Sequence, residues 1–145
     1  TDILHEYFFP RAAYADMIAG AREILLSHKA NLLNASVRVV DAADVALPYA
    51  TEPAFSLVLY INQTTDDDGN AKMRALTRAL IDLTVEHKGR FFLPYQLHFT
   101  ADQLLASYPE LPSFLAKKRE YDPGELFVST FYRGISRLLE GSTGT

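Results

Sequence analysis

Four segments of the chain carry the alternating or densely apolar side chains that are typical of β-strands. They span residues 3–9, 35–40, 55–62 and 90–98. In the third segment, Leu57, Leu59 and Ile61 make one face wholly apolar, whereas the other face mixes polar and apolar side chains. This pattern predicts a sheet with one face against helices and the other face in contact with something partly polar. Pro94 cannot donate to a ladder, so the fourth strand is expected at an edge or with a bulge.

Five further segments are predicted to be helical, the first two from apolar residues spaced three and four apart. They span 11–28, 71–87, 100–108, 113–121 and 126–139, the last as a helix or as an extended segment that becomes helical. Thr100 and Gln103 have the spacing of a capping box, in which each side chain satisfies a backbone amide at a helix start. The final residues, 141–145, are expected to be frayed.

The order of these segments, β-α-β-β-α-β and then helices, predicts an α+β fold of the ferredoxin-like type. Such a fold has an antiparallel four-stranded sheet with two helices on one face. We expect residues 1–99 to form this core and residues 100–145 to be a helical extension of the same domain. The fold does not predict a function, since it occurs in enzymes, regulatory ligand-binding modules and RNA binders.

The sheet face that the two helices leave open has an unusual composition. It should hold charged, aromatic and apolar side chains: Glu6, Arg38, Tyr60 and Tyr95 with Leu4, Phe8, Val58 and Leu93. This set is too aromatic for a simple solvated surface and too charged for a dry core. It therefore favours a ligand site or a domain interface. The alternative is that the C-terminal helices cover these residues.

Composition and charge exclude several classes of function. The chain has 145 residues, a net charge of -4 and no cysteine. The absence of cysteine excludes disulfides, thiolate metal sites and a Cys nucleophile. Few Lys or Arg residues lie in the predicted strands, which argues against nucleic acid, and no apolar run is long enough to cross a membrane. A cytoplasmic parent is expected, although a chain that begins at Thr1 carries no information about targeting segments.

Motifs for metal and phosphate chemistry are missing. The acidic run 66–68 before Gly69 lacks the glutamate of a calcium loop, because Ala75 stands at that position. The run is explained as a helix N-terminus, where negative charge is favoured. The four histidines have no metal-ligand spacing, and no glycine-rich phosphate loop or serine nucleophile motif is present. We expect no metal.

The C-terminal third resembles the end of the FAD-linked oxidases of the vanillyl-alcohol oxidase type. The similarity lies in the strand 89–98 (GRFFLPYQLH), then Tyr108-Pro109, Phe114, Lys118 and the run 121–127 (YDPGELF). In that family a last strand is followed by helices and an R-x-x-x-D-P-x-x-x-F tail. The resemblance extends to the whole order of elements and implies a substrate or cap domain. The family's FAD-binding domain does not occur in these residues.

Among such oxidases the sugar and polyol oxidases, including alditol and aldonolactone oxidases and decaprenylphosphoryl ribose oxidase, look nearest. The resemblance places Arg38 where a basic residue points at the substrate and the flavin edge. Ser36 stands where the alditol and aldonolactone group has Glu. Glu6 matches a pocket Gln of the ribose oxidase, and Tyr95 lies near the position of a catalytic-site Lys. Tyr60 and Ser56 lie on the strand that supplies further substrate contacts.

The resemblance implies a flavin reaction in which a C–OH group loses a hydride and a proton. Glu6, Tyr95 and His98 are candidates for the base, with His98 also near the substrate. Arg38 would stabilise negative charge on the substrate oxygen or the flavin, and Arg38 and Tyr95 are the candidate cofactor contacts.

The sequence thus predicts the substrate-binding half of an FAD-dependent oxidoreductase, inactive without its partner domain. The partners expected are an FAD-binding domain of the same polypeptide and a small-molecule alcohol, with no nucleic acid and no membrane; a homodimer stays open. A second hypothesis is a stand-alone ligand-binding or regulatory domain that dimerises through its sheet. A third, a dimeric α+β-barrel enzyme, is disfavoured because the C-terminal helices would obstruct barrel pairing.

Overall fold

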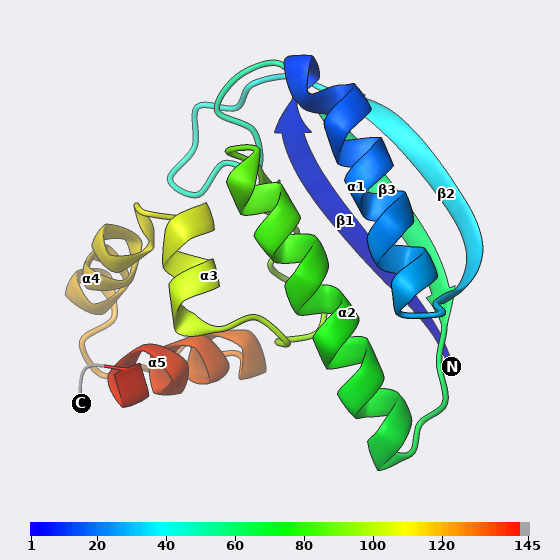
Figure 1. The fold of residues 1–145 in the computed structure, drawn as a ribbon. Coiled ribbons are helices and arrows are strands. Elements are labelled where there is room, and N and C mark those ends of the chain that lie inside the picture. Colours follow the sequence, from blue (N-terminus) through cyan, green and yellow to red (C-terminus); the bar gives the residue numbers. More distant parts are fainter. Residues whose placement is uncertain (143–145) are drawn as a thin grey trace.

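Alternating side chains and two amphipathic helices produce the α+β architecture that the sequence predicts. The computed structural model describes residues 1–142, and its sheet has the strand order β2-β3-β1-β4 with every neighbouring pair antiparallel (Figure 1). The strands are β1 (Asp2–Pro10), β2 (Asn31–Val40), β3 (Ala54–Asn62) and β4 (Arg90–Phe91). The helices are the 3-10 turn η1 (Arg11–Ala13), α1 (Tyr14–Ser27), α2 (Asp67–Glu86), α3 (Ala101–Ser107), α4 (Leu111–Tyr121) and α5 (Thr130–Ser142).

The apolar face of β3 packs on helices, as its alternation predicts. Leu57, Leu59 and Ile61 are buried in one core with Met17 of α1 and Leu80 of α2. Both helices cover the same side of the sheet (Figure 1), so the opposite side is the open face. None of the helices described between residues 1 and 142 has the length and apolar character needed to cross a bilayer.

β1 and β3 match their predicted bounds to within one residue, whereas β2 and β4 differ by four residues or more. β2 begins at Asn31 rather than at residue 35, because a bulge between Leu32 and Asn34 absorbs one residue and interrupts the alternation. β4 pairs only through Arg90 and Phe91 instead of running to residue 98. The Phe92 amide still donates to the Glu6 carbonyl at 2.9 Å, and beyond it the chain turns away before Pro94, which cannot donate.

Two helices start four residues away from their predicted first residues. α2 begins at Asp67, four residues early, because Asp66 caps its N-terminus by accepting from the Gly69 amide at 2.8 Å. α5 begins at Thr130 rather than at residue 126. It continues through Gly141 and Ser142, which were expected to be frayed. The same expectation for residues 143–145 lies outside the described residues.

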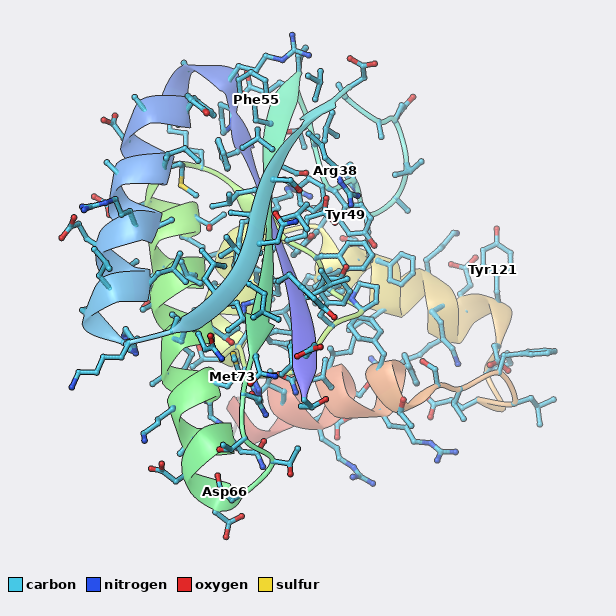
Figure 2. All side chains as sticks on the ribbon, turned by 90° about the vertical axis from the view of Figure 1, so that its right-hand side faces the viewer. Arg38, Tyr49, Phe55, Asp66, Met73 and Tyr121 are labelled. Carbon is cyan, nitrogen blue, oxygen red and sulfur yellow. The ribbon has the colours of Figure 1, made fainter. Side chains whose placement is uncertain are left out.

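The helical extension is fastened to the β4 edge of the sheet. The Tyr108 hydroxyl donates to the Phe91 carbonyl at 2.5 Å, and Arg90 forms an ion pair with Glu110. Figures 1 and 2 together show that α4 and α5 project past the sheet on its open side but stand beside the open face rather than over it. The open face is therefore a floor with one helical wall.

The capping box of α3 is present as predicted, and it yields a test of stability. Thr100 Oγ1 accepts from the Gln103 amide at 3.2 Å, and Gln103 Oε1 accepts from the Thr100 amide at 3.1 Å. We expect Thr100→Ala to lower the free energy of unfolding by about 1 kcal/mol, measured by urea denaturation. Ser113→Ala, at an exposed position in α4, is the control and should change it by less than about 0.5 kcal/mol. Equal values for the two variants would contradict the role of the cap.

Candidate functional site

Register places a carboxylate, a hydroxyl and a guanidinium together on the open face. Glu6 of β1 stands opposite Val58, and Arg38 of β2 stands opposite Ser56 of β3. Because directly opposed residues in antiparallel strands share a face, these side chains converge. The Ser56 hydroxyl donates to Glu6 Oε1 at 2.8 Å, and Arg38 Nη1 lies 3.8 Å from the same oxygen.

The three groups differ in exposure. Ser56 is fully buried and Glu6 is 9% exposed, whereas the Arg38 side chain is 63% exposed because β2 is an edge strand. Both contacts to Glu6 use Oε1, and within residues 1–142 no hydrogen bond reaches Oε2. A ligand on the open face would therefore meet a fixed, partly desolvated carboxylate oxygen and an exposed cation.

Four aromatic rings form a chain beside Glu6. The Phe8 and Tyr49 rings stack at 5.2 Å, Tyr49 lies 5.0 Å from Phe92, and Phe92 lies 4.6 Å from Tyr95, all measured between ring centroids. Figure 2 shows Tyr49 and Arg38 on the same side of the sheet, away from α1 and α2. We call Glu6, Arg38, Ser56 and these four rings the open-face cluster.

The two tyrosines of the open-face cluster are hydrogen-bond donors rather than bases. Burial, and then the Glu6 carboxylate, raise the pKa of Tyr49. The same two causes raise the pKa of Tyr95, with Arg38 opposing them. A raised pKa keeps each phenol protonated at neutral pH, so Tyr95 does not suit the role of base.

The structure separates His98 from the open-face cluster. The His98 carbonyl accepts from Arg78 Nε at 2.8 Å, and burial together with Arg74 and Arg78 of α2 lowers the pKa of the imidazole. His98 also acts electrostatically on His5. Tyr95 and His98 were expected on a strand, and both lie in the irregular segment after β4.

Ser36 and Tyr60 lie on the open face, but neither is part of the open-face cluster. Ser36 is exposed opposite Val58, two residues from Arg38. The Tyr60 hydroxyl donates to Asp2 Oδ2 at 3.1 Å, and this bond is the main cause of a raised Tyr60 pKa. Tyr60 thus belongs to a second polar group at the far end of the strands.

Sequence reasoning missed two cluster members, Phe92 and Tyr49. It placed Leu93 on the open face in place of Phe92, whereas Leu93 is buried in the core. Tyr49 lies in the segment between β2 and β3, which carries no regular secondary structure. Long irregular connections in small domains are uncommon and often functional. An aromatic residue after Pro48 in such a segment was therefore the available signal.

The hollow beside Glu6 is too small for a ligand by itself. It is lined by residues such as Tyr95, Gln96 and Phe92 and has a volume of about 20 Å³, which is room for roughly one water molecule. In the part of the chain that the structure describes, no three His, Asp or Glu side chains gather as a metal site requires. The open-face cluster can therefore form one wall of a site, to be completed by another surface.

Comparison with known proteins does not assign this chain to a family. No protein-family model matches this chain, and no curated protein matches it in sequence.

Proposed function

We propose that this chain is the substrate-side half of an FAD-dependent oxidoreductase that oxidises a C–OH group. The observation that carries the proposal is the open-face cluster: a carboxylate, held by Ser56 with one oxygen free, beside an exposed guanidinium and an aromatic floor. Alcohol oxidation needs a proton acceptor and a positive charge near one oxygen atom. The resemblance in sequence to FAD-linked oxidases points to the same chemistry.

Each member of the cluster has a role in this proposal. Glu6 Oε2 takes the proton from the substrate hydroxyl, while Ser56 fixes the carboxylate through Oε1. Arg38 stabilises the negative charge that develops on the substrate oxygen. Tyr95 stays protonated and orients the substrate as a donor.

The residues present fit the reacting part of a flavin but not its phosphates. Arg38 and the rings of Tyr49 and Tyr95 offer a cation and aromatic surface on a face that none of the described helices covers. No glycine-rich phosphate loop occurs in the sequence. A bound flavin would supply the hydride acceptor, and another segment would hold it. The small hollow at Glu6 favours this arrangement over a stand-alone ligand-binding domain.

The test is made on the complete product of the gene that encodes this chain. We expect the purified protein to show the visible absorption of an oxidised flavin. Anaerobic addition of sugars, polyols and other alcohols should bleach that absorption for at least one substrate. A protein that binds no flavin, or a flavin that none of these alcohols reduces, would contradict the proposal.

A further inference from the structure

A second surface, on the opposite side of the sheet from Arg38, is also unpartnered. A groove with a volume of about 410 Å³ runs between α1 and β2. Its walls are mainly apolar and include Ile18, Leu25, Leu32, Val37 and Leu57. Of the strands described, β2 pairs only with β3, so its other edge presents unpaired amides and carbonyls beside the groove.

β2 lacks the features that usually protect an edge strand. Such strands are commonly short or carry proline, lysine or inward charges. β2 has ten residues, a single charged side chain, Arg38, and no proline or glycine. Its exposed apolar side chains include Val37 at 40% and Val39 at 68% exposure. A strand with these properties is suited to adding another strand at its edge.

We propose that two copies of this chain pair through β2, antiparallel and about a two-fold axis at Val37, to form one continuous eight-stranded sheet. The stretch 34–40 is free of the bulge at Leu32 and Asn34. An axis at its centre would pair 34 with 40, 35 with 39, and 36 with 38. Arg38 of each copy then faces Ser36 of the other, so no two like charges are directly opposed.

The apolar groove is suited to contact with a second copy of the chain. Val37 lies opposite Leu57, on the helix side of the sheet, so the two-fold axis brings the grooves of both copies together beneath their α1 helices. Such an interface is isologous, and each groove is covered by the matching surface of the other copy. On this side of the sheet, Tyr14, Leu26, Leu32, Val37 and Val39 expose about 430 Å² per copy. The backbone edge and polar side chains of β2 add to this area, so full coverage would reach the lower limit of roughly 1,000 Å² per dimer for a specific interface. We therefore expect micromolar affinity.

Charge variants at the axis provide the main test, by sedimentation velocity of the 145-residue chain. The wild-type chain should shift from monomer to dimer across the micromolar range. Val37→Lys and Val37→Glu should each raise the dimer dissociation constant at least about 30-fold, because like charges then face each other. An equimolar mixture of the two variants should recover a heterodimer. Val45→Lys, at an exposed valine outside β2, is the matched control and should stay dimeric.

Cysteine variants test the register. The chain has no cysteine, so Val37→Cys supplies one thiol per copy at the axis and should form a disulfide-linked dimer under mild oxidation. Val39→Cys is more exposed and on the same face, but it faces Ala35 of the other copy and should stay unlinked. A monomer at every concentration would overturn the proposal, as would equal linking by both variants. The complete gene product provides a further test. If it is monomeric and its β2 amides are protected from hydrogen exchange, the proposal is overturned, because another strand of the same polypeptide then pairs with β2.

Discussion

Replacing Arg38 with alanine in the complete flavoprotein should slow flavin reduction by the alcohol substrate at least about 100-fold. This is the usual scale for removing one group that stabilises charge in a transition state. Arg38 is the exposed cation of the open-face cluster, 3.8 Å from Glu6 Oε1. Arg38→Lys keeps a charge but loses the planar fork, and it should retain an intermediate rate. Stopped-flow absorbance of the flavin measures each rate directly.

Two controls separate this effect from misfolding. Flavin content should be equal in wild type and variants, since another segment is proposed to hold the phosphates. Arg22→Ala removes an arginine of α1, on the opposite side of the sheet, whose side chain pairs with Glu23 in solvent; it should leave reduction unchanged. A rate in Arg38→Ala that equals the wild-type rate would remove Arg38 from the mechanism, even if the protein binds flavin.

Acid should destabilise the chain through His5 well before most carboxylates titrate. Burial, and then the nearby His98, lower the pKa of His5 to about 4. In the unfolded chain a histidine titrates near 6.5. Between these two values the unfolded state binds a proton that the folded state refuses, so folding stability decreases as pH falls. The full contribution is present above about pH 6.5, and roughly 3 kcal/mol is lost by about pH 4.

Urea denaturation at several pH values would measure this loss. His5→Gln should flatten the decline between about pH 6.5 and 4, apart from a smaller contribution in the same direction from His98, whose pKa is also lowered. His28→Gln, at an exposed histidine at the end of α1, is the matched control, and equal flattening by both substitutions would contradict the assignment to His5. If His5→Gln kept the wild-type slope, the buried imidazole would not be its source.

The sequence predicts the fold well where period and burial coincide. β3 is a central strand with one face on helices, so its apolar residues Leu57, Leu59 and Ile61 alternate with residues of the other face. This alternation is visible in the sequence without any knowledge of the tertiary structure. Boundaries are missed where polar contacts decide them. Asp66 starts α2 ahead of its apolar pattern. Asp122 accepts from the Leu126 and Phe127 amides, which holds that segment out of α5.

The site follows the same division. The alternation of side chains along each strand predicted a shared face for Glu6, Ser56 and Arg38. The structure places these three side chains within contact distance. Tyr49 and the displacement of His98 depend on irregular segments, whose paths no periodicity encodes. Tyr95 was assigned to a strand that ends at Phe91, and yet it reaches the cluster through its contact with Phe92.

The strand order gives the two charged members of the cluster different freedom to vary. Glu6 lies on β1, between two neighbours, so replacing it disturbs a buried hydrogen bond and packing on both sides. Arg38 and Ser36 lie on β2, an edge strand whose side chains are exposed. Substitutions along this edge can move or change the charge at small cost in stability. Among related sequences with other substrates, positions 34 and 36 should therefore diverge first. Stability alone would also tolerate a change at Arg38, but its role in the reaction should retain it together with the Glu6–Ser56 pair.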